Sequence, residues 1–216
     1  MKKTVIAISI ALAFNLSAAQ NDHMHDSIGN SASYKIMMSM HEPMVNTPFV
    51  SSGSVEVDFL SNMIPHHQGA VDSSKLLLEF SKNDTVRKIA STIISDQEKE
   101  IKEFNDILKN KTYSTTKLDS AKYDEFVAAE RLDMKNMMAD MGKVKDTNNV
   151  DRDFLESMIF HHKGAIDASN QILKYTKDKT IIQIAKNIIK AQEKEIKEFN
   201  ELLKAVFKSK YTKLNM

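Results

Sequence analysis

Apolar residues recur at intervals of three and four along most of the chain, which is the spacing of amphipathic helices. The pattern predicts leading helices at about 57–80 and 151–175, each followed by a second helix with an apolar stripe over 86–108 or 181–203. A fifth helix is expected at about 122–141. The stripes of the leading helices are Leu60, Met63, His67, Ala70, Ser74 and Leu77, and Leu155, Met158, His162, Ala165, Ser169 and Ile172.

The two helical hairpins are copies of one unit. Residues 58–109 align without a gap on 153–204, and 29 of the 52 aligned residues are identical. Because two hairpins with apolar stripes pack most simply against each other, we predict an all-α four-helix bundle with pseudo-two-fold symmetry and a Met-rich linking helix. A Met-rich segment precedes each copy, and Met37, Met40, His41 and Met44 of the first correspond to Met134, Met137, Met138 and Met141 of the second.

The start of the chain predicts export. Lys2 and Lys3 precede an apolar run at 5–14 that is too short to span a bilayer, and small residues follow at 17–19. We therefore expect a periplasmic protein whose mature chain has no membrane span. The predicted divisions are a signal peptide at 1–19, a Met/His-containing segment at 20–55, a first hairpin at 56–110, a linker with the Met-rich helix at 111–148 and a second hairpin at 149–208. The segment at 20–55 is expected to be poorly ordered unless a ligand fixes it.

Composition narrows the chemistry. The 216 residues include 13 Met and 7 His but no Cys, which excludes disulfides, thiolate metal sites and a Cys nucleophile. The 30 basic and 29 acidic residues leave a net charge of +1, so no basic footprint argues for nucleic acid. Methionine thioether is therefore the only sulfur group that the chain can offer to a bound metal ion.

The Met and His residues recur at matching places in both copies, which favours a metal site. A Met-rich stripe at i, i+3, i+4 and i+7 puts four thioethers on one helical face, and Met63 with His67 can hold one ion across one helical turn. Thioether and imidazole suit Cu(I) and, by analogy, Ag(I). The candidate ligands are Met37, Met40, His41, Met44, Met63, His66, His67, Met134, Met137, Met138, Met141, Met158, His161 and His162. The role of His23, Met24 and His25 is open.

Each of these residues also has a purely structural interpretation. A helical Met stripe can fill a core, Pro43 is expected to break its helix, and only one of two adjacent His residues can face a core squarely. Gln97 and Gln192 face the His stripes, so a Gln–His hydrogen bond is expected, either fixing a metal ligand or acting as a structural contact.

Two further features concern the surroundings of the His pairs. Gly69 and Gly164 would let another segment approach closely. The glutamates of the second helices are expected to form a solvated charged face. They are Glu98, Glu100 and Glu103, with Glu193, Glu195 and Glu198 in the second copy.

The motif Met-Ile-Pro-His-His-Gln-Gly-Ala, followed by Ile-Ile-x-x-Gln-x-x-Glu-Ile, resembles the domain of unknown function 305 family, in two tandem copies. The resemblance implies a ferritin-like four-helix bundle and a periplasmic role in copper resistance through Met and His ligands. The second copy departs from the motif, with Phe160 in place of Pro65 and Lys163 in place of Gln68, so it lacks the kink signal of a proline.

We therefore predict a non-enzymatic protein that sequesters or chaperones Cu(I), with Cu(II) or Ag(I) as further cargo. Copper export or chaperone proteins are the expected partners. A di-iron oxidase is disfavoured because its Glu-x-x-His pairs are absent, and Met63, Ile64, Met158 and Ile159 stand where the glutamates should be. The alternative is a helical interaction module with a Met-rich binding face.

Overall fold

The computed structural model describes residues 31–207. Within this range the chain is helical, without strands, and it ends in a short π-helical turn, η1 (Leu203–Phe207). The α-helices are α2 (Ala32–Asn46), α3 (Val55–Phe80), α4 (Asp84–Asn110), α5 (Ser120–Met141), α6 (Val150–Tyr175) and α7 (Lys179–Leu202). The predicted signal peptide, and His23, Met24 and His25, lie outside the described residues.

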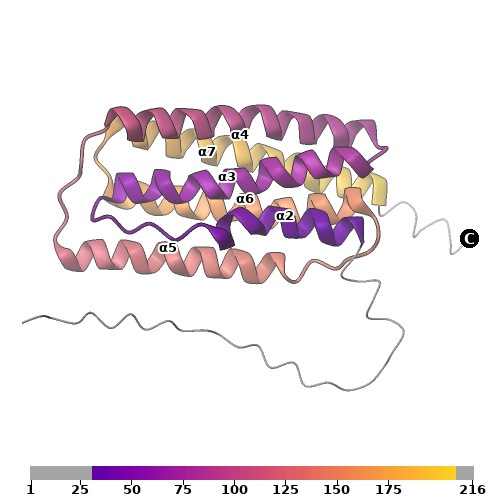
Figure 1. The fold of residues 1–216 in the computed structure, drawn as a ribbon, viewed down its shortest axis with the longest axis horizontal. Helices are drawn as coiled ribbons and strands as arrows, with labels where there is room; N and C mark the ends of the chain where they lie inside the picture. The colour runs from indigo at the N-terminus through magenta and orange to yellow at the C-terminus, as the bar shows by residue number, and fades with distance from the viewer. Residues whose placement is uncertain (1–30, 208–216) are drawn as a thin grey trace, which may run out of the picture.

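The helices form three layers with α3 and α6 in the middle (Figure 1). Each hairpin pairs one central helix with one outer helix, α3 with α4 and α6 with α7. On the opposite face α2 packs against α3 and α6, and α5 packs against α6. The prediction of an all-α bundle built from two hairpins is confirmed, and the linking helix lies along the bundle.

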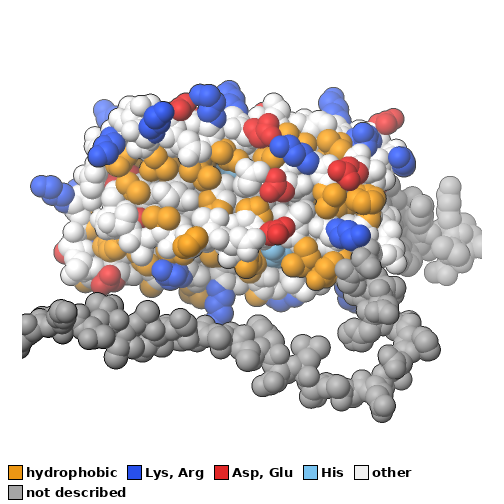
Figure 2. Space-filling view, in the orientation of Figure 1, with side chains coloured by type: hydrophobic (Ala, Val, Ile, Leu, Met, Phe, Trp, Pro, Cys, Tyr) orange, Lys and Arg blue, Asp and Glu red, His pale blue; other side chains and the backbone are white. Residues whose placement is uncertain are grey.

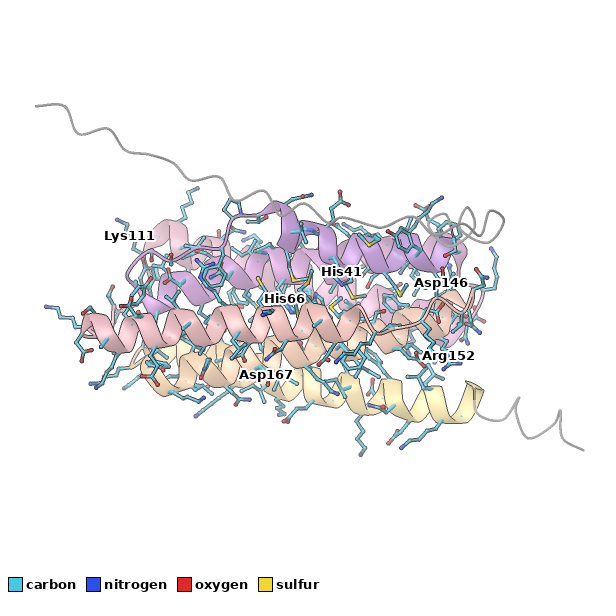
Figure 3. The ribbon with its side chains drawn as sticks, turned by 90° about the horizontal axis from the view of Figure 1, so that it is seen from below. His41, His66, Lys111, Asp146, Arg152 and Asp167 are labelled. Atoms are coloured by element: carbon cyan, nitrogen blue, oxygen red, sulfur yellow. The ribbon has the colours of Figure 1, made fainter. Side chains whose placement is uncertain are left out.

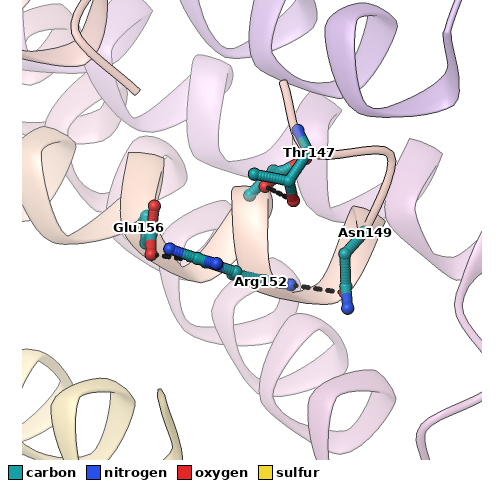
Figure 4. A network of polar contacts seen from close by, with 5 residues as sticks. Thr147, Asn149, Arg152 and Glu156 are labelled. Carbon is teal, nitrogen blue, oxygen red and sulfur yellow. Dashed lines mark hydrogen bonds and ion pairs between the residues drawn. The ribbon is translucent and has the colours of Figure 1, made fainter. Parts of the chain in front are cut away.

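Both central helices begin with the same arrangement of polar contacts. At α6 the Asn149 side chain accepts a hydrogen bond from the Arg152 backbone, and Thr147 donates to Asp153 through its N–H and hydroxyl (Figure 4). At α3 Ser52 donates to Asp58 in the same two ways. Caps of this kind satisfy backbone donors that no helical carbonyl can reach, so the repeat extends to how its helices start.

The segment expected to be poorly ordered contains a helix. The cap comes from Ser31, whose hydroxyl accepts from the Tyr34 N–H, and the buried side chains of Ile36, Met40 and Met44 form a stripe toward the bundle. Pro43 does not break this helix, which runs on to Asn46. The prediction of a break at Pro43 was wrong, because the burial of a regular apolar stripe outweighs the effect of a proline in the last turn.

The expectation that only one His of each pair faces the core was also wrong. His66, His67, His161 and His162 are all buried. The reason is the three-layer arrangement: α4 and α7 cover one face of the central helices, while α2 and α5 cover the other.

The surface carries mixed charge. Figure 2 shows basic and acidic side chains interspersed over one face, with apolar side chains between them. Within the described residues, no helix combines the length and the apolarity that crossing a membrane requires.

Candidate metal site

Two of the four histidines meet at the centre of the bundle. The rings of His66 on α3 and His161 on α6 have their centroids 3.8 Å apart. His161 Nε2 donates a hydrogen bond to the His66 backbone carbonyl at 3.0 Å, which leaves its Nδ1 buried without a partner. Both ring nitrogens of His66 are buried without a partner. An imidazole in that state has a free lone pair, and a metal ion can use it.

Burial keeps both imidazoles neutral. It lowers the pKa of His66 well below its ordinary value, and the neighbouring His67 and His162 lower it further. The pKa of His161 falls well below its ordinary value for the same reasons, burial first and His66 next. Neutral imidazole is the form that binds metal ions, so no proton has to be displaced from these rings.

A cavity of about 40 Å³ lies beside His66, among α3, α5 and α6. The volume suits a single ion or water molecule. Sulfur atoms gather in this part of the molecule, near His66 and His41, when it is viewed onto α2 and α5 (Figure 3). The lining residues are Phe49, Phe59, Asn62, Met63, His66, Glu130, Asp133, Met134, Met137, Gly164 and Ala168.

The cavity has a carboxylate that the sequence analysis missed. Glu130 lies four residues before Met134, one helical turn away on the same face of α5, and this spacing could have revealed it. It is 6% exposed, and its Oε1 is buried without a partner. Burial, with the negative charges of Asp133 and Asp58 adding to it, raises the pKa of Glu130 to about 8. Burial also raises the pKa of Asp133.

The other two histidines turn away from the cavity, toward the outer helices. His67 Nε2 donates to Glu100 Oε2 at 2.8 Å, and His162 Nε2 lies 2.6 Å from Glu195 Oε2. These two glutamates are half-buried, contrary to the expected solvated face, whereas the other four of the set are exposed as predicted, namely Glu98, Glu103, Glu193 and Glu198. Glu100 and Glu195 take the contact predicted for Gln97 and Gln192, whose side-chain oxygens are buried without partners.

The pairing predicted for Met63 changes accordingly. It shares the cavity with His66, three residues on, while His67 contacts Glu100. Three and four residues both bring side chains onto one helical face, so the sequence pattern alone did not separate the two histidines.

The close approaches predicted at the two glycines are present. A Cβ on Gly69 would lie 2.1 Å from the backbone oxygen of Met40 on α2. A Cβ on Gly164 would lie 2.2 Å from Met137 Sδ on α5. Met40 and Met137 correspond in the repeat, so each glycine admits the equivalent methionine of the covering helix.

The remaining candidate ligands divide by burial. Met40, Met44, Met137, Met141 and Met158 belong to one buried cluster, with Met138 packed at its edge. Met37 and His41 are half-buried on α2, where His41 Nδ1 donates to the Met37 backbone carbonyl at 2.7 Å. The structure brings Met63, His66, Met134 and Met137 together at one space, and it does not bring His41 there.

The donors at the cavity fit a soft metal ion. Met63, Met134 and Met137 offer thioether sulfur, and His66 offers an imidazole with both nitrogens free. Within residues 31–207 no group of three or more His, Asp or Glu side chains is placed to hold a metal ion. A metal ion held here would therefore have thioether sulfur among its neighbours, a donor that suits Cu(I) and that Mg²⁺, Ca²⁺ and Mn²⁺ do not prefer.

Residues 56–203 match the family model described as domain of unknown function 305 (DUF305). The chain belongs to the DUF305 family. A single match covers both hairpins, so two tandem copies of the family domain are not confirmed, although the hairpins repeat within it. A curated relative, the uncharacterized protein L153 of Acanthamoeba polyphaga mimivirus, is 45% identical over 50 residues, which are 23% of this chain and 33% of the relative. The match thus spans about a third of that relative's length.

Solved DUF305 structures share the fold. A DUF305 fragment from Deinococcus radiodurans is 24% identical, with a TM-score of 0.51, covering 69% of this chain and 95% of the fragment. CopM in its Cu(I)-bound form is 25% identical, with a TM-score of 0.51, covering 70% of this chain and 97% of CopM. The bundle is therefore the ferritin-like bundle of this family.

Proposed function

We propose that this DUF305 protein is an exported, periplasmic copper-binding protein that sequesters or chaperones Cu(I), and Ag(I) by analogy, and so contributes to copper tolerance. The observation that carries the proposal is the cavity, where three thioether side chains and the unpartnered imidazole of His66 line one small space. The role is one of binding and not of catalysis, with copper export or chaperone proteins as partners. The similarity to CopM, which was solved with Cu(I) and with Ag bound, supports it.

The burial of the methionines favours metal binding over the alternative, a Met-rich face for partner helices. A recognition surface needs exposed, adaptable side chains. In the described part of the chain only Met38 is an exposed methionine, at 45%, while Met40, Met44, Met137 and Met141 are buried. Their thioethers are accessible to an ion that enters the bundle, but not to the surface of another protein.

The proposal is tested by removing sulfur without removing volume. Leu has nearly the shape of Met but no lone pair, so M134L/M137L should abolish one tight Cu(I) equivalent in a titration against a competing Cu(I) chelator. The free energy of unfolding should change by less than about 1.5 kcal/mol per site. The matched control is M38L, an exposed Met-to-Leu change that should leave Cu(I) binding as it is.

Two results would count against the proposal. Wild-type protein with no Cu(I) binding tighter than micromolar would favour the interaction module. Full Cu(I) stoichiometry and affinity in M134L/M137L would show that these methionines are core filler.

A further inference from the structure

The unpartnered carboxylate of Glu130 gives the cavity a donor that Cu(I) does not require. Its side chain makes no hydrogen bond or ion pair with any residue of the range 31–207, although it is 6% exposed. A buried polar group without a partner is costly, and a cation placed beside it removes much of that cost. Since Glu130 lines the same space as Met63 and His66, a cation in the cavity would lie beside it.

The surroundings of Glu130 contain two further carboxyl groups. Asp133 lines the cavity as well, and Asp58 is close enough to act on Glu130 electrostatically. Arg131, the next residue along α5, stacks instead on the ring of Phe49, with its Cζ 4.2 Å from the ring centroid. The cavity therefore combines soft neutral donors with two carboxyl groups, those of Glu130 and Asp133.

The related position in the first half of the chain has no such carboxylate. The alignment of the Met-rich segments places Ser33 where Glu130 stands and Ile36 where Asp133 stands. Both residues are buried, on the face of α2 that carries Met40. Met40 and Met158 share a buried cluster, and α2 packs against α6, so thioether sulfur and not carboxylate is the donor that these residues offer there.

On the basis of the proposed function, we infer that Glu130 equips the cavity among α3, α5 and α6 to bind Cu(II) as well as Cu(I) or Ag(I), a capacity that the corresponding face of α2, with Ser33 in its place, lacks. Cu(II) is harder than Cu(I) and prefers nitrogen and oxygen ligands. His66 supplies the nitrogen, and Glu130, once the incoming cation has displaced its proton to solvent, supplies an anionic oxygen that neutralises part of the second positive charge. The position containing Ser33 offers no anion, so a divalent ion there would be buried with its charge uncompensated.

The test compares Cu(II) with Ag(I) in proteins that differ only at Glu130. All proteins carry H23A/H25A, because those two imidazoles can bind Cu(II) outside the cavity. In this background E130Q should lose one Cu(II) equivalent, or bind it at least tenfold more weakly, in a titration against a competing chelator. Its Ag(I) stoichiometry, measured by native mass spectrometry, should stay unchanged. D124N removes an exposed carboxylate from the same helix and should behave like the parent.

Every outcome bears on the inference. A parent that binds Ag(I) but no Cu(II), or an E130Q variant that keeps its Cu(II), overturns it and leaves the proposed function standing. A parent that binds neither Cu(I) nor Ag(I) overturns the proposed function as well. If circular dichroism shows that E130Q is unfolded, E130S, which copies the residue of the first half, is measured in its place.

Discussion

The two corresponding glycines should respond very differently to the same substitution. In G69A the new Cβ would lie 2.1 Å from the Met40 carbonyl oxygen and 3.1 Å from its carbonyl carbon. Both are backbone atoms, so relief requires a movement of α2 itself. In G164A the Cβ would meet Met137 Sδ at 2.2 Å, which is the far part of a flexible side chain. A rotation of the Met137 side chain can relieve that contact.

The magnitudes follow from these distances. Carbon atoms pack at about 3.5 Å, so α2 would have to move by more than about 1 Å in G69A. Overpacking of this kind costs about 1–3 kcal/mol, and a helix displaced as a unit belongs at the upper end. Each substitution also gains about 1 kcal/mol of helix propensity. We therefore expect G69A to lose about 2 kcal/mol of stability and G164A to remain within about 1 kcal/mol of wild type.

Circular dichroism during urea unfolding measures the free energy of unfolding of both variants, and circular dichroism during heating measures their Tm. The Tm of G69A should fall by roughly 4–8 °C, because 1 kcal/mol corresponds to about 2–4 °C in a domain of this size. Displacement of Met137 in G164A should instead weaken Cu(I) binding at the cavity, which Gly164 lines. Equal destabilisation of the two variants, or a stable G69A, would refute the close backbone approach of α2.

Two further predictions concern pH and helix capping. Burial raises the pKa of Glu130 from 4.5 to about 8. Between these two pH values the folded state keeps a proton that the unfolded state has released. Metal-free wild type should therefore lose up to roughly 5 kcal/mol of stability relative to E130Q as the pH rises from 4.5 to 8, and no more above pH 8. The same difference in the free energy of unfolding between the two proteins at pH 5 and at pH 8.5 would contradict this. The N-cap residues form a second matched pair: N83A should cost about 1 kcal/mol in urea unfolding. Asn83 accepts only from backbone N–H groups of its own helix, whereas Asp178 caps Ile181 and also accepts from the backbone of Ser114 in the distant linker. D178A should therefore cost more, and equal losses would show that the bond from Ser114 contributes nothing.

The hairpins could be predicted from the sequence because local signals agreed with one another. The buried stripes, the capping residues before α4 and α7 and the duplicated motif all indicate the same helices. The helix α2 could not be predicted in this way, since Gly, Ser, Asn and two prolines around it indicate a loop. Its stability comes from Met40 and Met44 packing into the bundle, and that contact involves residues distant in sequence.

The candidate site was predicted in its ligand types but not in its grouping. Periodicity places Met63 on one helical face with both His66 and His67. In the structure the ring of His66 lines the cavity, whereas the ring of His67 contacts Glu100. Which one meets Met134 depends on how α5 crosses the central helices, which periodicity does not determine. The spacing from Met134 places Glu130 on the same face of α5, but the sequence does not show that its carboxyl is buried without a partner.

The contact between His66 and His161 joins equivalent residues of the two halves, which is the isologous geometry of a two-fold symmetric dimer. In such a dimer of separate, identical chains, every residue on one side of the axis recurs on the other. Any acid introduced beside one imidazole would then be introduced beside both. Here one polypeptide supplies both halves, so Glu130 and Ser33 can differ while the central pair of rings stays matched. Covalent fusion thus lets corresponding positions of a symmetric scaffold change independently of each other.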